Sequence, residues 1–460
     1  MLTEEIANHI LNTKYENISK EDINHTKKAF IDYLAVTNKG INEKTTQIAL
    51  KTLKDININT NPTKYKIIGY NEDNYFNEIE TGFINGISAH VLDLDDGHRL
   101  GQIHPGAAIF STALALSQKY NLNSKKFIEA VIIGYDTAIS LGKLLNPQHR
   151  NKGFHTSGTV GTLATGATAS KILKLNKKQI IYTLGLCGTQ AAGLLESDHS
   201  GSMGKTLHLG KAIQNGILSA YLAKNNFTGA KSIIEGKEGI INTMAQEIPK
   251  EKILEFKKNL NKHYINEIYY KKYPFCRHLH SSIDSGIKIH EYLLKNNIKT
   301  NTIKNITIKT YKIAAEHNNY KPKNNQELKQ SLPVALAITL KLGSPNINLI
   351  EKLLKNNLLN YSQEEYTEIY NLIKKIKIKE DKNLNDSFPK ERPSNVEITF
   401  KHGENINFLT RMPLGEKENP LTTEEIIKKF KELNPKYDIN KLKIIENMED
   451  YKINTIINKI

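Results

Sequence analysis

Apolar residues in the first half of the chain recur at the three-to-four-residue spacing of helices that bury one face. Ile23, Phe30 and Leu34 share one such face, and residues 19–22 (SKED) give it a start that resembles a capping box. The same spacing recurs in four further segments: 104–120, 125–145, 159–175 and 178–195. Several of them are rich in alanine and glycine, which lets helices approach closely. The pattern predicts a core of helix packed on helix.

The pattern changes near residue 270, where segments with alternating apolar and polar residues begin. Residues 305–311 (NITIKTY), 375–379 (KIKIK) and 395–400 (NVEITF) have the period of two that half-buried strands require. Residues 332–342 keep a helical pattern. These segments predict a smaller α+β unit in the second half of the chain.

A last helix is predicted after residue 420. Thr422 and Glu425 have the spacing of a capping box, and Ile426, Phe430 and Leu433 follow on one helical face. The stretch before it, HGENINFLTRMPLGEKENP, is rich in turn residues. We therefore expect the chain to return to the helical part at its C-terminal end.

Composition and charge favour a soluble globular protein. The 460 residues are 39% hydrophobic and 24% charged, and the formal net charge of +16 comes with lysines scattered along the whole chain. No basic run is interleaved with aromatic residues, so we do not expect a nucleic-acid partner. The N-terminal segment MLTEEIANHILN contains two acids and no long apolar stretch, and no run of ~18 apolar residues occurs. We expect an unexported protein without a membrane partner.

The cysteine content gives no sign of a cross-linked or metal-stabilised fold. The two cysteines, Cys187 and Cys276, stand in apolar or aromatic surroundings, and neither belongs to a CxxC pair. A disulfide framework or a zinc ribbon is therefore not expected, and a reducing, cytoplasmic location fits.

Candidate chemistry is concentrated in short glycine-containing segments rich in histidine, lysine, arginine and aspartate. They are HVLDLDDGHRLGQIHPG (90–106), GFHTSGTVG (153–161), GSMGKTLHLG (201–210) and KKYPFCRHLHSSID (271–284). This composition suits general acid–base chemistry on an anionic substrate. An imidazole titrates near neutral pH, so His104, His155 and His280 are the candidates for moving a proton. Lys205 and Arg277 can stabilise negative charge next to a carboxylate.

Parts of these segments also resemble metal or nucleotide sites. The turn 93–98 (DLDDGH) and His104 offer metal-ligand atoms at close spacing, but no HExxH or comparable ligand pattern occurs. Residues 204–206 (GKT) resemble the end of a phosphate-binding loop, which would need glycine where His199 stands. We expect neither a metal nor another cofactor, and we assign Asp93 the role of orienting a neighbouring imidazole.

Each candidate also has a purely structural explanation. A single histidine near glycines is more often a satisfied core or surface residue, and Lys205 alone would be solvated on most helices. His98, His208 and His278 are as readily structural as they are part of a binding site. The presence of several such segments in one chain favours a catalytic site.

The segments resemble the MmgE/PrpD family, which contains 2-methylcitrate dehydratase, cis-aconitate decarboxylase and iminodisuccinate epimerase. The matching pieces are NGISAHVLDLDDGH followed by HPG, GFHTSGTVGTLATGATASKILKL, GSMGKTLHLGKAIQNGILSAYLAKNNFTG, KKYPFCRHLHSSID, SLPVALA and PLTTEEIIKKF. They run in family order over almost the whole chain. The resemblance implies a mostly α fold, with a large all-helical domain formed by both chain ends (1–269 and 401–460) and an inserted smaller α+β lid domain (270–400). It also implies a homodimer.

The resemblance also implies which residues form the site. Those that line up with the family's active-site positions are Asp93, His104, His155, Lys205 and His280. Those we expect to bind substrate beside them are Arg277, His98, His208, Lys272 and His278. The implied partner is a small di- or tricarboxylate.

The chain departs from the family in three places. Asp96 is followed by Gly97 where many members have threonine, so a hydroxyl is missing next to His98. Gly106 stands in HPG where HPS is common. Dehydratases close to the methylcitrate pathway usually carry a tryptophan before that histidine, and this chain has no tryptophan. These differences concern the substrate and leave the shared chemistry standing.

The sequence favours a metal-independent lyase or isomerase. Dehydration, decarboxylation and epimerisation share a carbanion or enolate-like species near a carboxylate, and sequence does not separate them. We rank a 2-methylcitrate dehydratase-like hydro-lyase first because that activity is widespread in the family. Enzymes like cis-aconitate decarboxylase or iminodisuccinate epimerase follow closely. An alternative of another class is a non-catalytic polycarboxylate-binding dimer, which holds ligand but moves no proton.

Overall fold

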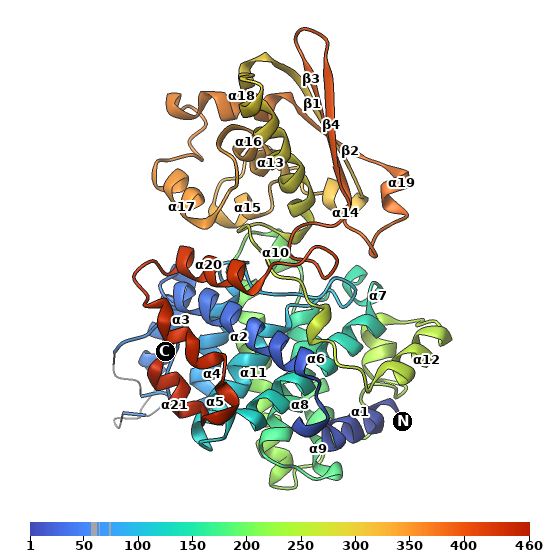
Figure 1. Cartoon of the computed structure of the whole chain (residues 1–460). Coiled ribbons are helices and arrows are strands. Elements are labelled where there is room, and N and C mark those ends of the chain that lie inside the picture. The colour runs from blue at the N-terminus through green and yellow to red at the C-terminus, as the bar shows by residue number, and fades with distance from the viewer. Residues whose placement is uncertain (57–61, 64, 73–74) are drawn as a thin grey trace. The chain divides into compact units, whose positions relative to one another are not determined.

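The fold is mostly helical with one small sheet, as the computed structural model shows (Figure 1). The structure describes residues 1–56, 62–63, 65–72 and 75–460. The chain divides into two compact units: unit 1 is Met1–Tyr269 with Thr422–Ile460, and unit 2 is Tyr270–Leu421. Among the described helices, none combines the length and the hydropathy that crossing a membrane requires.

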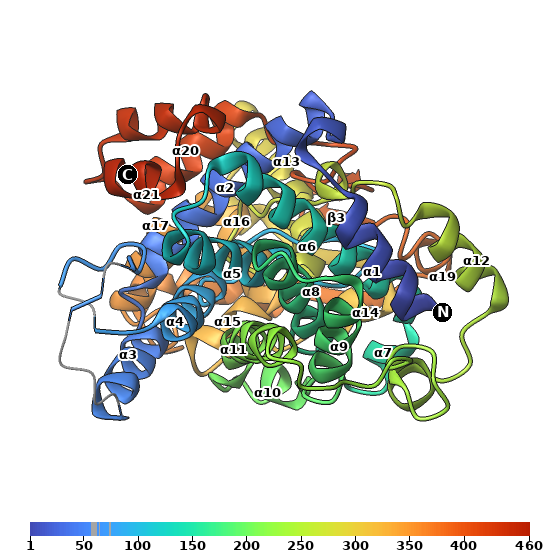
Figure 2. The same cartoon turned by 90° about the horizontal axis from the view of Figure 1, so that it is seen from below.

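Helices build unit 1. They are α1 (Leu2–Asn12), α2 (Lys20–Gly40), α3 (Lys44–Ile56), α4 (Glu78–His90), α5 (Pro105–Lys119), α6 (Ser124–Leu145), α7 (Gln148–Asn151), α8 (Thr156–Ile172), α9 (Lys177–Gly188), α10 (Glu196–His199), α11 (Gly204–Lys224), α12 (Lys250–Asn259), α20 (Thr423–Leu433) and α21 (Ile453–Lys459). The central helix is α8, which packs against α5, α6, α9 and α11 (Figure 2). Every residue of α8 except Lys171 is buried, as expected for a helix covered on all sides.

Small residues let α8 and α11 approach each other closely. A Cβ atom added to Gly216 would lie 2.1 Å from Thr165 Oγ1, so no side chain fits there. The Thr165 hydroxyl also donates a hydrogen bond to the Ala212 carbonyl at 2.7 Å. This packing places the start of α8 beside the first turns of α11. Two of the predicted site residues, Lys205 and His208, lie in those turns.

The C-terminal segment belongs to unit 1 through the contact between α20 and α2. Thr422 and Glu425 form the predicted capping box at the start of α20. Buried Lys429 then places its Nζ 2.6 Å from Asp32 Oδ1 on α2 and 2.7 Å from the Leu94 carbonyl. Helix α20 therefore also supports the turn that carries the acidic residues of the candidate site.

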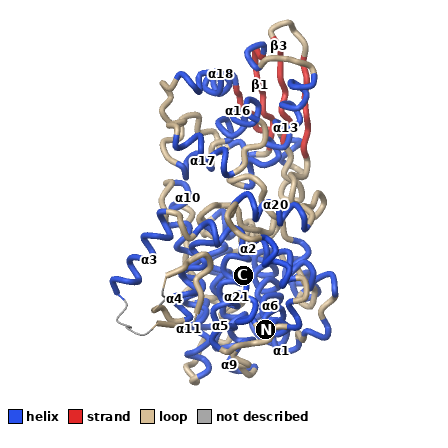
Figure 3. Tube along the Cα trace, turned by 60° about the vertical axis from the view of Figure 1, so that its left-hand side comes forward, coloured by secondary structure: helices blue, strands red, loops and turns tan. Residues whose placement is uncertain are grey.

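Unit 2 holds the sheet, whose strands are β1 (Ile303–Thr310), β2 (Ile376–Glu380), β3 (Ser394–Phe400) and β4 (Asn405–Thr410) (Figure 3). Their order is β2-β1-β3-β4, with β1 and β2 parallel and the other pairs antiparallel. Ile306 of β1 lies opposite Ile376 of β2 and Ile398 of β3. Buried side chains alternate along β3, as half-buried strands require.

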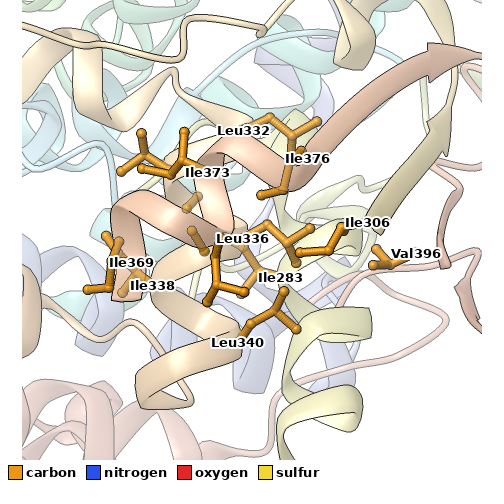
Figure 4. Close-up of a cluster of buried hydrophobic side chains, with 14 of the residues drawn as sticks. Ile283, Ile306, Leu332, Leu336, Ile338, Leu340, Ile369, Ile373, Ile376 and Val396 are labelled. Atoms are coloured by element: carbon orange, nitrogen blue, oxygen red, sulfur yellow. The ribbon is translucent and has the colours of Figure 1, made fainter. Parts of the chain in front are cut away.

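The helices of unit 2 are α13 (His280–Lys295), α14 (Lys312–Ala315), α15 (Asn325–Lys329), α16 (Leu332–Leu342), α17 (Ile347–Lys355), α18 (Thr367–Lys375) and α19 (Lys382–Asn385). Figure 4 shows part of the hydrophobic core that they form with the sheet. Ile283 of α13, Leu336 of α16 and Ile373 of α18 meet Ile306 and Val396 from the strands. Unit 2 thus has a core of its own.

The predicted elements agree well with the observed ones. The three predicted strands correspond to β1, β2 and β3, and the helix predicted at 332–342 is α16. The turn-rich stretch after Phe400 contains the unpredicted strand β4, which pairs with β3. This pairing keeps residues 401–421 with unit 2, whereas the sequence analysis had placed them with the C-terminal segment. Cys187 and Cys276 are free thiols.

Candidate active site

An acidic turn follows α4 and carries three buried carboxylates, Asp93, Asp95 and Asp96. Asp93 has a positive φ of 55°, a conformation uncommon for a residue other than glycine. Strained backbone of this kind clusters at functional sites, where the surrounding structure over-determines it. The turn therefore places its carboxylates in fixed positions.

Asp96 ties this turn to the helices behind it. The Tyr135 hydroxyl donates to Asp96 Oδ2 at 2.5 Å, and the Gly106 amide donates to Oδ1 at 2.9 Å. Burial raises the pKa of Asp96 to about 7, and the charge of Asp95 adds to this effect. A Cβ atom at position 106 would lie 2.6 Å from Asp96 Oδ1, which explains why this chain has HPG in place of HPS.

His104 caps the start of α5 and has a defined tautomer. Its Nδ1 lies 2.8 Å from the Asp96 carbonyl oxygen and 3.6 Å from Asp95 Oδ2. Because a carbonyl can only accept, Nδ1 carries a proton and acts as the donor. His104 therefore exchanges protons through Nε2.

His155 and His208 form a direct pair between the start of α8 and α11. Their Nδ1 atoms lie 3.0 Å apart, so one ring donates and the other accepts. Burial lowers the pKa of His155 well below its ordinary value, and the nearby charge of Lys205 lowers it further. Burial likewise lowers the pKa of His208. His155 is thus a neutral imidazole at neutral pH and a candidate base.

Lys205 is the cation of this group. It lies in the first turn of α11, with its Nζ 3.6 Å from Asp93 Oδ1 and 3.3 Å from Asp198 Oδ1. Its side chain is partly exposed, with 18% of its surface accessible, so a ligand can reach it. Its charge also acts on His155. Of the candidates predicted from sequence, unit 1 therefore brings Asp93, His104, His155, Lys205 and His208 together.

His98 lies at the other end of the acidic turn and makes local contacts. Its Nδ1 accepts a hydrogen bond from the Gly101 amide at 2.9 Å, so its proton is on Nε2, 3.6 Å from Glu267 Oε2. Burial opposes ionisation of Glu267, but His98 and Lys262 outweigh it and lower the pKa of Glu267 to about 2. These contacts fix the end of the acidic turn to Gly101 and Glu267.

Two of the candidates from unit 2, Arg277 and His280, are joined to each other within that unit. Arg277 Nη2 lies 3.1 Å from Glu416 Oε1, and Arg277 Nη1 lies 3.0 Å from His280 Nδ1. His280 Nε2 lies 3.0 Å from the Phe275 carbonyl, so Nε2 is the protonated nitrogen. Both His280 and Arg277 are buried, at 0% and 3% exposed. Inside unit 2 these residues form one ordered, charge-balanced cluster.

His278 and Lys272 lie outside that cluster. His278 Nδ1 is 2.6 Å from the Tyr311 hydroxyl, and its ring stacks on His317 at a centroid distance of 5.7 Å. Lys272 is exposed, whereas the neighbouring Lys271 is buried.

Sequence reasoning missed the pair His90 and Asp95. His90 ends α4, and its Nδ1 lies 2.8 Å from Asp95 Oδ2, with both side chains buried. The His90 ring centroid is 5.0 Å from that of His104 and 6.2 Å from that of His155. The available signal was position, since His90 is the first residue of the motif HVLDLDDGHRLGQIHPG.

Two groups of side chains have the composition of a metal site. The ligand atoms of His90, Asp95 and His104 lie within 4.8 Å of one another. However, the donor role of His104 Nδ1 toward a carbonyl leaves only Nε2 of that ring for a metal. The second group, His9, Asp136 and His263, consists of two imidazoles bonded to the same carboxylate oxygen. In the first group only His90 and Asp95 are hydrogen-bonded to each other, and His104 is bonded to the Asp96 carbonyl.

Comparison with known proteins shows that the chain is similar to several cis-aconitate decarboxylases. The chain is 22% identical to human cis-aconitate decarboxylase over 98% of this chain and 92% of that protein. It is 22% identical to the cis-aconitate decarboxylase of Aspergillus terreus over 84% of this chain and 80% of that protein. A cis-aconitate decarboxylase-like protein of Aspergillus oryzae is 24% identical over 53% of this chain, a match that spans about half of that relative's length, 51%.

The family matches extend over both parts of the chain. Residues 4–252 match the family model of the MmgE/PrpD N-terminal domain. Residues 273–450 match that of the MmgE/PrpD C-terminal domain. The resemblance found in the sequence motifs is thereby confirmed, and this chain belongs to the MmgE/PrpD family.

Proposed function

We propose that this protein is a lyase that moves a proton on a small di- or tricarboxylate by acid–base catalysis. The observation that best supports this is the gathering in unit 1 of His104, His155, His208 and Lys205 beside buried carboxylates. These residues come from segments far apart in the chain. Imidazoles with differing protonation beside a reachable ammonium suit proton transfer next to a substrate carboxylate.

The hydrogen bonds favour different roles for the two main histidines. His155, neutral because of its lowered pKa, is the candidate base. His104 has its Nδ1 proton fixed and a carboxylate nearby, which favours a positive charge, so it is the candidate acid through Nε2. Lys205 is the candidate to bind a substrate carboxylate and to stabilise charge that develops next to it. The sequence analysis assigned Asp93 to a neighbouring imidazole; because its Oδ1 lies 3.6 Å from Lys205 Nζ, we propose that it orients this ammonium instead.

Among the possible reactions, we place decarboxylation of a cis-aconitate-like substrate first. The named relatives are cis-aconitate decarboxylases, whereas the sequence motifs alone had put a 2-methylcitrate dehydratase-like hydro-lyase first. The relatives support the shared lyase chemistry but give the dehydratase no specific support. Dehydration and epimerisation are therefore the other outcomes of the test below.

The proposed decarboxylation balances with these residues. The bond to the departing carboxylate breaks, CO₂ leaves, and the electron pair moves toward the adjacent double bond and the remaining carboxylates. The carbanion takes one proton from the imidazolium of His104, which regains a proton from solvent. This reaction removes no proton from carbon, so the base role of His155 belongs to the dehydration and epimerisation outcomes. Each turnover thus releases one CO₂ and consumes one solvent proton. Lys205 stabilises the anion during this step.

The family resemblance extends the proposal to unit 2. We include His280 as a further catalytic residue and Arg277, His278 and Lys272 as substrate-binding residues. His98 and His208 complete the proposed binding residues, and the active form is proposed to be a homodimer. Light scattering of the purified chain tests the dimer. His280→Gln tests the catalytic role, with a predicted fall in kcat.

The reaction is tested with ¹³C-labelled cis-aconitate, 2-methylcitrate and iminodisuccinate, followed by NMR in the presence and absence of a chelator. Formation of ¹³CO₂ from cis-aconitate supports the first proposal. Loss of water from 2-methylcitrate, or stereochemical scrambling of iminodisuccinate, replaces it with one of the two other family activities. A folded protein that binds these compounds but changes none is a carboxylate-binding protein, and the lyase proposal fails.

A further inference from the structure

His90 is a buried histidine that has no role in the proposed reaction. Its side chain is 1% exposed, and its Nδ1 lies 2.8 Å from Asp95 Oδ2. Its other ring nitrogen, Nε2, is buried without a hydrogen-bond partner among the residues that the structure describes. Buried polar atoms without partners are rare in folded proteins, so each needs an explanation.

The two contacts of Asp95 suggest what His90 does. The same oxygen that binds His90, Asp95 Oδ2, lies 3.6 Å from Nδ1 of His104. Asp95 Oδ2 thus faces two imidazoles, bonded to one and close to the other. A proton on His90 Nε2 would be a buried donor without an acceptor, so the surroundings fit the form of His90 that carries only the Nδ1 proton. In that form the negative charge of Asp95 remains uncompensated by His90.

We propose that His90 is a positioning residue for His104: it donates its Nδ1 proton to Asp95 and thereby holds that carboxylate against the Nδ1 side of His104. The carboxylate stabilises the positive charge that His104 carries when its Nε2 holds a proton. Asp95 acts on His104 through its charge across 3.6 Å, because the Nδ1 proton of His104 is donated to the Asp96 carbonyl, and His90 lies behind the carboxylate. The inference rests on the proposed function, because it assigns His104 the role of acid.

Other ionisable groups around His104 do not supply this charge. The groups that the described contacts place around its ring are His90, Asp95, Asp96, His155 and Tyr269. Asp96 contacts His104 through its main-chain carbonyl, and its carboxylate is bound by Tyr135 and Gly106. Burial raises the pKa of Asp96 to about 7, so it is a weaker source of negative charge at neutral pH. Asp95 is the remaining carboxylate in contact.

Three variants distinguish a positioning role of His90 from a role in packing alone. His90→Asn keeps a donor where Nδ1 lies but lacks Nε2, so it should hold Asp95 and keep kcat within about threefold of the wild type. His90→Leu fills the space without a donor, and Asp95→Asn removes the charge. Each should lower kcat about 10- to 100-fold, the range seen when groups that orient a functional imidazole are lost, with little change in KM. His9→Gln, in a second buried His–Asp pair, is the matched control and should leave kcat unchanged.

Titration of His104 gives a readout that does not depend on turnover. In ¹⁵N-histidine-labelled protein, His90→Leu and Asp95→Asn should lower the pKa of His104, whereas His90→Asn should leave it near the wild-type value. A folded His90→Leu protein with wild-type kcat and an unmoved His104 titration would overturn the inference. So would a His90→Asn protein as impaired as His90→Leu. If His90→Leu does not fold, Asp95→Asn and His90→Asn decide by the same titration.

The same titration separates this inference from the proposed reaction. A shifted His104 in a protein that turns over none of the labelled carboxylates supports the positioning role and removes the lyase function. Turnover of cis-aconitate with an unshifted His104 in both His90→Leu and Asp95→Asn keeps the lyase and removes the positioning role.

Discussion

The Nδ1 atoms of His155 and His208 lie 3.0 Å apart, so these two rings must hold complementary tautomers. If both were fully protonated, two N–H groups would face each other in a buried site. Burial and positive neighbours already lower the pKa of His155 well below 6.5. The pair is therefore built to keep His155 neutral.

This relationship predicts the acid side of the pH profile. If neutral His155 is the base of a dehydration or an epimerisation, kcat/KM should stay high as the pH falls through 6.5 and decline only at lower pH. His155→Gln should remove most of the activity, and the activity that remains should not show this decline. The measurement is kcat/KM from pH 4.5 to 8 with the substrate identified above. A midpoint at or above 6.5 that is assigned to His155 would contradict this role.

Lys205 should matter for chemistry through its charge. Lys205→Ala is expected to lower kcat/KM by about 10²–10³, or about 2.7–4 kcal/mol, the loss typical when a donor to a developing anion is removed. Lys211→Ala is the matched control, because Lys211 is an exposed lysine of the same helix. Circular dichroism checks that both variants fold. Wild-type kcat/KM in folded Lys205→Ala would remove Lys205 from the mechanism.

Gly106 should be intolerant of any side chain. Its added Cβ atom would lie 2.6 Å from Asp96 Oδ1 and 2.7 Å from the Tyr135 hydroxyl, so Gly106→Ala must displace the acidic turn. We expect a loss of about 1–3 kcal/mol in the free energy of unfolding and a fall in kcat. Gly161→Ala is the control, since its Cβ would meet only Ala212 Cβ at 3.7 Å. Urea denaturation measures both, and equal stability of the two variants would contradict the argument.

A second His–Asp cluster should stabilise the fold in a pH-dependent way. Asp136 Oδ2 lies 2.9 Å from His9 Nε2 and 2.8 Å from His263 Nδ1. Burial disfavours charge on both partners, but their mutual attraction outweighs it. This attraction raises the pKa of His263 and lowers the pKa of Asp136. His9 also contributes to the lowering of the Asp136 pKa.

The direction of these shifts gives the pH window. A raised pKa of His263 stabilises the fold below the unfolded value of about 6.5, and this contribution is lost as the pH rises through the folded value. A lowered pKa of Asp136 stabilises above about 3.9 and is lost at lower pH. His263→Gln should therefore cost most stability between about pH 4 and 6.5 and progressively less above it. Unfolding free energies at pH 5.5 and 8.5 test this, and a larger cost at pH 8.5 would contradict it.

Much of the fold follows from local sequence patterns. The capping box Thr422–Glu425 and the helix Leu332–Leu342 were predictable because their signals lie within one element. Strand β4 was not, because its burial alternates between exposed and intermediate positions and only Thr410 is buried. An edge strand that buries so little leaves a weak hydrophobic pattern. Its place in the sheet depends on pairing with β3, a contact outside the segment itself.

The candidate site was predictable in residue type but not in pairing. The motifs indicated His104, His155 and Lys205, yet the contact between His155 and His208 joins residues of two separate helices. His90 escaped notice because a single histidine in sequence looks like an ordinary core residue. Its link to Asp95 depends on the turn geometry, including the positive φ of Asp93, which sequence does not reveal.

The central claim is that the imidazoles of unit 1 move a proton on a small carboxylate. Its most direct test is turnover of cis-aconitate in deuterated buffer, with the product analysed by proton NMR and mass spectrometry. The wild type and His9→Gln should release CO₂ and place one solvent deuteron on carbon, while folded His104→Gln should release little CO₂ and form little deuterated product. Product without carbon-bound deuterium, or His104→Gln with the wild-type rate and labelling, would contradict the account.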